Sequence, residues 1–403
     1  MTDTVTAHVV SDDDEAVRIA RDLVPRLAVG ADRRDAEREL PWEQVAQIRA
    51  SGLLGITVPR SHGGAGAAAA TVAEALRLVG TVDLSLAQIL QPHFAFLDSL
   101  RRSGGEEVRN RVFADVLAGA LVGNAQAERT GRNSHEQRTR LEPAGDGRYR
   151  ITGVKYYATG SLFAQWLAVT AKVEVPGFGE PQPYVVFVPR DAPGVEVVDD
   201  WDGMGQRTTG SGTVRLTGVE VPAERVVPHY LTFTGPTTYG AFAQLGHASI
   251  DVGLARGALE RAAEFVRTRS RAWFESGSDT ASEDPLVIQQ FGELELQVRA
   301  AEALVQRAAA AVDAANADPT DDTTAEASIA VAAAKAAGGR AAVAVSNALF
   351  EVAGTRSAAD GLNLHRYWRD ARTHTLHDPV RWKIQHIGRY SLNGRRPPRH
   401  GQI

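Results

Sequence analysis

Hydrophobic residues recur at intervals of three and four along most of the first 118 positions, which is the period of an amphipathic helix. The first stripe begins at Asp13, and the residues before it show no such pattern. A short apolar piece, Leu53–Pro59, lacks the period and is predicted to be extended. The predicted helices cover residues 13–51, 67–80, 85–102 and 106–118. We therefore expect a disordered tail over residues 1–12 and an N-terminal helical domain over residues 13–120.

Near Leu121 the pattern changes from helical spacing to the alternation that is typical of β-strands. β-branched residues become frequent, and glycine and proline turns separate the short segments. The predicted strands cover residues 148–157, 166–173, 184–189, 195–198 and 213–221. This region, residues 121–231, is expected to form a central β-barrel-like domain between two helical parts.

Helical spacing returns at Ala241 and persists almost to the end of the chain. Long helices are predicted over residues 241–266, 286–315 and 324–353, and the last of these is unusually rich in alanine. Small side chains let helices approach closely, which suits a bundle. The resulting fold class is α+β, with a C-terminal four-helix bundle over residues 232–394 and an exposed arm over residues 395–403.

The stretch Tyr367–Val380 concentrates candidate chemistry. His374 and His377 lie three apart, on one face of the predicted helix. Pro379 cannot continue that helix, and Asp378 is a favourable N-cap for the next one. Two imidazoles at a helix tip can act as an acid–base pair, bind a metal or satisfy backbone groups. A metal needs three or four ligands, and no carboxylate except Asp378 stands nearby, so we predict no metal site.

Composition narrows the classes of protein. The chain has 403 residues, a formal net charge of -5 and no cysteine. The mild charge disfavours a nucleic-acid binder, and the lack of cysteine excludes disulfides and thiolate nucleophiles. The acidic start is unlike a signal peptide, and no apolar run approaches the ~20 residues of a membrane span. We expect a soluble cytoplasmic protein.

Other polar residues stand where the predicted elements meet. His93 lies in an apolar helix, where a lone histidine is more often a satisfied core group than a functional one. Asn124, in the segment Val122–Gln126, can hydrogen-bond a ring edge or close a turn. Thr159–Ser161 ends a predicted strand, and its hydroxyls and amides can contact a planar cofactor or cap a turn.

Two more candidates follow later in the chain. Trp201 opens a glycine-rich segment that holds no Walker lysine, so nucleotide hydrolysis is not expected. Its indole can cover a ring system or fill the β core. Arg356 follows a helix end beside glycine, a setting that suits a phosphate, although a solvated arginine is the default.

Three segments, Gly205–Thr213, Asp251–Glu264 and Trp368–Gly388, resemble the acyl-CoA dehydrogenase superfamily. The resemblance covers about residues 13–394. Within the superfamily, the run Trp368–Pro379 is similar to the flavin-dependent monooxygenases, the branch of the sulfur-acquisition oxidoreductases and dibenzothiophene monooxygenase. The resemblance implies a homotetramer with FMN between the β domain and the bundle.

The same resemblance implies a two-component reaction. A separate reductase would supply reduced flavin (FMNH2), O2 would add at its C4a carbon, and the C4a-hydroperoxyflavin would oxygenate a small organosulfur or related compound. His93, His377 and Asn124 would be catalytic. The residues implied to contact the flavin are Asn124, Gln126, Thr159, Gly160, Ser161, Trp201, Arg356 and His374.

The chemistry of the residues favours an oxygenase. Imidazole titrates near neutral pH and can donate a proton to a reacting peroxide. An acyl-CoA dehydrogenase needs a carboxylate for an α-proton, and many of its relatives have Glu-Gly where this chain has His377-Asp378-Pro379. The alternatives are an FAD-dependent acyl-CoA dehydrogenase and a flavin-binding scaffold without activity.

Overall fold

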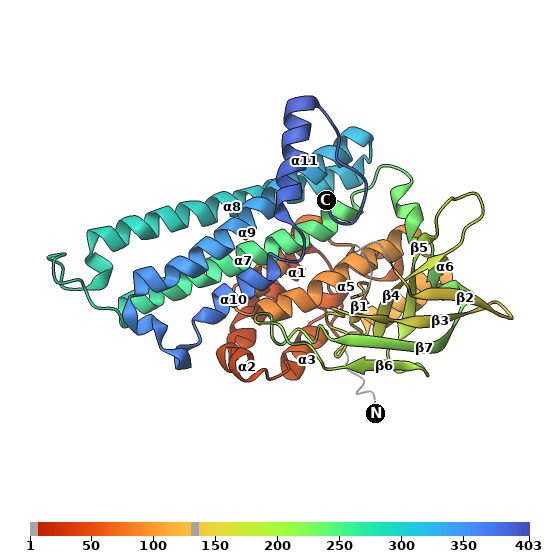
Figure 1. Cartoon of the computed structure of the whole chain (residues 1–403), viewed down its shortest axis with the longest axis horizontal. Helices are drawn as coiled ribbons and strands as arrows, with labels where there is room; N and C mark the ends of the chain where they lie inside the picture. The colour runs from red at the N-terminus through yellow and green to blue at the C-terminus, as the bar shows by residue number, and fades with distance from the viewer. Residues whose placement is uncertain (1–6, 130–136) are drawn as a thin grey trace.

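Three long helices and one β-sheet occupy opposite ends of the molecule (Figure 1). The computed structural model describes residues 7–129 and 137–403. The long helices are α7 (Tyr239–Thr268), α8 (Pro285–Ala317) and α9 (Asp321–Ala353). Helix α5 (Leu84–Ser103) lies between the two ends, since it packs on both α7 and the strand β1 (Val122–Ala125). The architecture is the predicted α+β arrangement of helices, sheet and bundle.

The N-terminal helices follow the predicted spacing closely. They are α1 (Asp13–Ala28), α2 (Ala31–Glu37), α3 (Trp42–Ala50), α4 (Ala69–Gly80), α5 and α6 (Glu106–Leu117). Asp12 caps α1 by accepting a hydrogen bond from the Glu15 amide at 2.8 Å. The piece predicted to be extended is instead a 3₁₀ turn, η1 (Leu53–Gly55), because its leucines are buried under α6 and α1 rather than paired in a sheet.

The predicted disordered tail is wrong for residues 7–12; residues 1–6 lie outside the described part of the chain. The His8 amide donates to the Ala50 carbonyl at 3.0 Å, and Val10 is only 3% exposed. Gly52 permits this contact, since a Cβ there would lie 2.1 Å from the His8 carbonyl oxygen. Burial of Val10, the backbone bond of His8 and hydrogen bonds from His8 and Ser11 to Glu15 hold a segment that has no helical period.

The sheet is mixed, with strand order β6-β7-β3-β2-β4-β5-β8 and β1 paired in parallel with β4. Its other strands are β2 (Arg140–Gly145), β3 (Arg148–Lys155), β4 (Trp166–Val173), β5 (Gln182–Pro189), β6 (Val195–Val198), β7 (Thr213–Pro222) and β8 (Val226–Val227). The sequence missed β1, β2 and β8, which are short or rich in charged residues. Of these, β1 matters most, because it carries Asn124.

The bundle is completed by α10 (His365–His374) and α11 (Val380–Asn393). Backbone carbonyls of α4 and the turn after it lie directly against α7: a Cβ on Gly253 or Gly257 would lie 2.2 or 1.9 Å from the Arg77 or Thr81 carbonyl oxygen. By length and composition α9 is apolar enough to cross a membrane, and 56% of its apolar window is buried. Its packing against α7 and α8 accounts for that composition.

The C-terminal segment is not simply an exposed arm. Ile403 is 2% exposed, and Lys383 of α11 donates to the Gln402 carbonyl. A Cβ on Gly240 would lie 2.2 Å from the His400 carbonyl oxygen, so the end of the chain packs on the start of α7. Arg396 bonds Asp322 at the start of α9 at 2.6 Å. The charged residues that predicted exposure are thus ones that fasten the tail.

Candidate functional site

A glycine-rich loop of the β domain, residues 200–212, packs against α10, the helix that carries His374. A Cβ on Gly205 would lie 2.2 Å from the Arg369 carbonyl oxygen, so only glycine allows this approach. The Gln206 amide donates to the Asp370 carboxylate at 2.6 Å. Burial, and next the nearby Asp35, raise the pKa of Asp370 to about 7. Since Asp370 lies one helical turn before His374, the loop meets α10 beside the histidines.

Asn124 presents an unused hydrogen-bond acceptor beside this loop. Its backbone amide donates to the Thr159 carbonyl at 2.9 Å, and its side-chain Nδ2 donates to the Tyr157 carbonyl at 3.3 Å. Among the described residues its buried Oδ1 has no partner, and neither do Ser161 Oγ and Gln206 Nε2. Buried polar atoms are ordinarily paired. These unsatisfied donors and acceptors fit a polar ligand such as a flavin ring.

The segment Thr159–Ser161 makes a sharp turn that hydrogen bonds fix to the glycine-rich loop. Gly160 has a φ of +75° and donates its amide to the Thr209 carbonyl at 3.0 Å. Thr159 Oγ1 and Ser211 Oγ share a hydrogen bond of 2.8 Å. The left-handed conformation at Gly160 turns the chain sharply, as glycine permits. The predicted residues Asn124 and Thr159–Ser161 therefore lie together, linked to the glycine-rich loop.

Trp201 belongs to the same group. Its indole nitrogen donates to the Gln206 carbonyl at 2.8 Å, and its ring meets Tyr157 edge-on with centroids 6.0 Å apart. Gln126 is different: its side chain is exposed, while its carbonyl accepts from Lys155 Nζ at 3.2 Å and Thr170 Oγ1 at 2.9 Å. Within the described part of the chain no hydrogen bond joins Gln126 to the other residues of the group, and its flavin contact stays a prediction.

His93 is fully buried, with both ring nitrogens held by backbone. Its Nε2 lies 2.8 Å from the Leu54 carbonyl oxygen, and its Nδ1 accepts from the Val122 amide at 3.0 Å. The proton therefore sits on Nε2. Burial lowers the pKa of His93 to about 4, so the ring is neutral. In the described structure His93 fastens β1, two residues before Asn124, and its catalytic role stays a prediction.

A third histidine, His247, contacts both His374 and His377, and the sequence analysis missed it. His374 Nδ1 lies 2.5 Å from Asp251 Oδ1, and its Nε2 lies 3.0 Å from His247 Nδ1. The His247 and His377 rings stack with centroids 4.0 Å apart. His377 keeps 42% of its side chain exposed, whereas His374 is buried. The two histidines therefore differ in role: His377 faces the solvent-accessible side, and His374 faces the core.

The predicted N-cap role of Asp378 is wrong. Helix α11 begins without a side-chain cap, and Asp378 Oδ2 lies 3.4 Å from His377 Nδ1 and 3.7 Å from Lys383 Nζ. Burial raises the pKa of Asp378, but the hydrogen bond with His377 and the Lys383 charge outweigh it and hold the pKa well below its usual value. Pairing of Asp378 with His377 and Lys383, both close in sequence, here displaces the capping preference.

Arg356 lies outside this group in the single chain. It is exposed in a 3₁₀ turn, η6 (Thr355–Ala358), and donates from Nη1 to the Arg269 carbonyl at 2.9 Å. Its predicted contact with a flavin phosphate stays a prediction. Within residues 7–129 and 137–403, no group of three or more acidic or histidine side chains is arranged to hold a metal ion.

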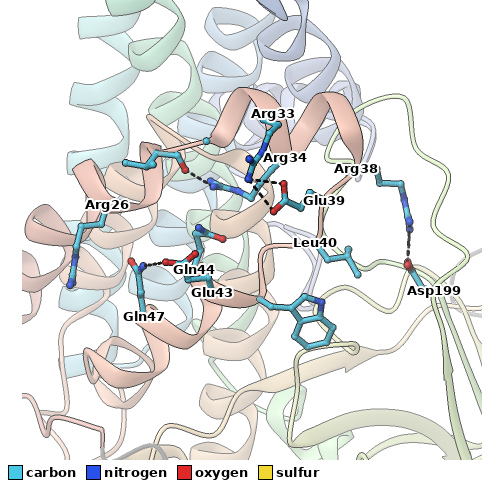
Figure 2. Close-up of a pocket in the computed structure, with 13 residues that line it drawn as sticks. Arg26, Arg33, Arg34, Arg38, Glu39, Leu40, Glu43, Gln44, Gln47 and Asp199 are labelled. Atoms are coloured by element: carbon cyan, nitrogen blue, oxygen red, sulfur yellow. Dashed lines mark hydrogen bonds and ion pairs between the residues drawn. The ribbon is translucent and has the colours of Figure 1, made fainter.

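A large pocket lies elsewhere, among α1, α2, α3 and the end of β6 (Figure 2). It encloses about 940 Å³ and contains several arginines. Figure 2 shows Arg33 paired with Glu39 and Arg38 paired with Asp199. Arg34 is buried and bonds Asp83 at 2.8 Å. Three of the arginines that line the pocket are thus paired with carboxylates, and no predicted site residue lines it.

Comparison with known proteins agrees with the fold. Family models of the acyl-CoA dehydrogenase N-terminal, middle and C-terminal domains match residues 12–120, 127–219 and 245–382. Dibenzothiophene monooxygenase of Mycolicibacterium goodii is 34% identical over 98% of both chains. The probable FMNH2-dependent monooxygenase SfnC of Pseudomonas putida is 30% identical, over 95% of this chain and 96% of its own.

A solved structure matches over a similar share of the chain. FMN-bound TdsC of Paenibacillus sp. A11-2 is 31% identical, covers 96% of this chain and 100% of its own, and superposes with a TM-score of 0.90. The chain belongs to the acyl-CoA dehydrogenase family. Within that family it is an enzyme of the flavin monooxygenase type, an oxidoreductase, as its full-length relatives are named.

Proposed function

We propose that the chain is a two-component monooxygenase that uses reduced FMN and O2 to oxygenate a small organosulfur compound. One full-length relative is named a dibenzothiophene monooxygenase, another a probable FMNH2-dependent monooxygenase, and one solved relative is bound to FMN. The alternative, an FAD-dependent acyl-CoA dehydrogenase, is less well supported. The reduced flavin would come from a separate reductase, and the enzyme would work in the cytoplasm, for which a chain without cysteine is suited.

The observation that carries this proposal is the state of the side chains at the His377 turn. The exposed group there is an imidazole, whereas the adjacent carboxylate, Asp378, has a side chain only 3% exposed and lies beside Lys383. A carboxylate with a strongly depressed pKa is a poor base, so Asp378 is unsuited to removing an α-proton from a thioester. The His377 imidazole can instead donate from a ring nitrogen, which a fully ionised carboxylate cannot do.

The unsatisfied polar atoms support FMN as the cofactor. Asn124 Oδ1, Ser161 Oγ and Gln206 Nε2 would pair with the polar edge of the ring, and Trp201 would cover it. When bound in its reduced form, FMN supplies the two electrons that place one oxygen atom of O2 in the substrate and the other in water. We further propose that Arg356 meets the flavin phosphate and that Gln126 lies at the edge of the site.

The chain's own residues would then control access and protons. The close approach of Gly205 to Arg369 seals the β domain against α10, which limits the entry of water. His93 holds β1, so that Asn124 keeps its position. His377 donates the proton that the departing oxygen needs, and its exposed face allows reprotonation from solvent.

Exposed apolar side chains support the predicted homotetramer. Leu286, Ile288 and Leu296 on α8 are 73%, 55% and 69% exposed, and Trp273 and Phe274 in the preceding loop are 61% and 79% exposed. Several large exposed apolar side chains on one helix and the loop before it are what an interface between subunits would cover. We propose that a second copy of the chain covers this surface of α8.

Turnover assays can test the proposed function. The enzyme would be mixed with FMN, NADH and a flavin reductase, and thioethers, sulfones and amines would be screened for oxygenated product and matching O2 uptake. Product formation that requires both reduced FMN and O2 supports the proposal. Reduction of bound flavin by an acyl-CoA without O2 would assign the chain to the dehydrogenases instead.

A further inference from the structure

A line of buried ionisable side chains crosses the bundle from α9 to the turn after α10. Lys335 Nζ lies 2.7 Å from Asp251 Oδ2, and the other carboxylate oxygen lies 2.5 Å from His374 Nδ1. His374 Nε2 lies 3.0 Å from His247 Nδ1, and the His247 ring stacks on His377. Lys335, Asp251, His374 and His247 are each no more than 4% exposed. We call these four residues the relay.

The hydrogen bonds of the relay determine which nitrogen of each imidazole carries the proton. An ionised carboxylate only accepts, so the proton on His374 must sit on Nδ1 and point to Asp251. His374 Nε2 then carries a lone pair and accepts from His247 Nδ1–H. The lone pair of His247 is consequently on Nε2, and none of the described residues hydrogen-bonds to that atom.

The charges of the relay balance. Burial raises the pKa of Asp251, but the Lys335 and His374 side chains outweigh it and lower the pKa overall. Burial lowers the pKa of His374, and burial together with the charges around it puts the pKa of His247 well below 6.5. Lys335 thus neutralises Asp251, and both relay imidazoles remain uncharged.

Backbone packing places the relay residues accurately. His247 and Asp251 lie four apart on α7, so both face one side of that helix. They hold His374 between them by its two nitrogens. On α9, a Cβ at Gly339 would lie 3.2 Å from Thr375 Cγ2 and 3.5 Å from Asp251 Oδ2, so a larger residue there would press on the relay.

We infer that Lys335, Asp251 and His374 hold His247 as an uncharged ring with its proton on Nδ1. His377 stacks on this ring while it transfers a proton. The role of His377 rests on the proposed function, whereas the state of the His247 ring does not. Lys335, Asp251, His374 and His247 are positioning residues in this scheme, because each acts through His377 rather than on the substrate.

The charged and titratable groups near His377 come from every element around it. They are His247 and Asp251 of α7, Lys335 of α9, His374 of α10, Asp378 of the following turn and Lys383 of α11. Because the relay is neutral, a substitution that leaves one of its charges unpaired changes the ease with which His377 holds a proton.

Ring nitrogen NMR of the whole enzyme tests the tautomers directly. The protein would be labelled with ¹⁵N-histidine, with His247→Gln and His374→Gln used to assign the two rings. We expect both rings to be neutral and to show a protonated Nδ1 and a pyridine-like Nε2 at pH 7.5. A His247 ring protonated on Nε2, or a doubly protonated His374, would overturn the inference.

Asp251→Asn provides the perturbation. Lys335 would donate to the new amide oxygen, which leaves the amide N–H groups facing His374 Nδ1. That nitrogen must then accept, and both imidazole protons move to Nε2. Unchanged tautomers in Asp251→Asn would contradict the assigned direction. If this variant does not fold, the wild-type spectrum still decides.

The pH–rate profile supplies the link to turnover. In Asp251→Asn the unpaired charge of Lys335 disfavours a protonated His377, so the alkaline limb should move to lower pH by about one unit at an effective dielectric constant of about 20. In Asp251→Asn/Lys335→Gln, which removes both charges, the limb should return towards the wild-type position. Identical profiles would refute the coupling. The expected tautomers without any oxygenated product would instead count against the proposed function alone.

Discussion

Replacement of His93 separates its structural contribution from a catalytic one. His93→Ala removes the partners of the buried Leu54 carbonyl and Val122 amide. Each unsatisfied group costs roughly 1–3 kcal/mol, and the cavity adds to this, so the expected loss is about 3–6 kcal/mol. That is a large part of the roughly 5–15 kcal/mol that stabilises a typical domain.

The ionisation of His93 adds a pH dependence with a definite sign. Burial lowers its pKa from 6.5 to about 4, so between these values the unfolded chain binds a proton that the folded chain does not. The stabilisation is complete above pH 6.5 and is lost as the pH falls towards 4, by about 3 kcal/mol in total and about 2 kcal/mol at pH 5.0. His229, whose pKa burial also lowers to about 4, adds a similar slope.

His93→Gln is the matched control, because its amide can both donate to Leu54 and accept from Val122 but does not titrate. Urea unfolding at pH 7.5 and 5.0, followed by tryptophan fluorescence, should show a smaller loss at pH 5.0 in His93→Gln than in the wild type. The wild-type slope in His93→Gln, or wild-type stability in His93→Ala, would refute the reasoning. Turnover lost about 10²–10⁴-fold in a stable His93→Gln would assign the residue to proton transfer instead.

Three further changes test other parts of the site. Gly205→Ala would clash with the Arg369 carbonyl and should weaken FMN binding at least about tenfold and lower the melting temperature by several degrees, whereas Gly361→Ala, with nothing within 4 Å, should do neither. His377→Ala should keep its melting temperature, because the side chain is 42% exposed, and lose about 10²–10⁴-fold in turnover. The control His8→Ala, whose side chain is 51% exposed, should keep its turnover, and equal turnover in both variants would remove His377 from the reaction. Leu296→Glu, on the exposed side of α8, should dissociate the oligomer, as measured by gel filtration and light scattering, whereas Val29→Glu, at a similarly exposed position in the N-terminal domain, should not. An intact oligomer in Leu296→Glu would disprove the α8 interface.

The sequence predicted the long elements well, because their hydrophobic period reports directly on burial. Strands β4 and β6 and the start of α6 fall on the predicted residues. Strand β2 was missed, since its segment contains arginine, glutamate and proline and follows no alternation. Strand β1 was missed because it has four residues and a glycine, and its pairing with β4 is a long-range contact that local propensity does not encode.

The site was predicted unevenly for the same reason. Asn124, Thr159 and Trp201 were singled out from the sequence and assigned to the flavin by the resemblance; their flavin contacts stay predictions, although hydrogen bonds link all three to one network. His247 and Asp251 were missed, although their spacing of four on an apolar helix, where ionisable residues are rarely buried without partners, is a usable signal. Asp378 was misassigned because its carboxylate pairs with His377 and with Lys383 in the first turn of α11, rather than with the first amides of that helix.

Oxygen isotope incorporation tests the central claim most directly. The wild-type enzyme would be given chemically reduced FMN, ¹⁸O2 and an organosulfur substrate, and the product would be analysed by mass spectrometry. The account predicts one ¹⁸O atom in each product molecule and little product in His377→Ala. Product that carries oxygen from water, or flavin that is reduced by an acyl-CoA in the absence of O2, would contradict it.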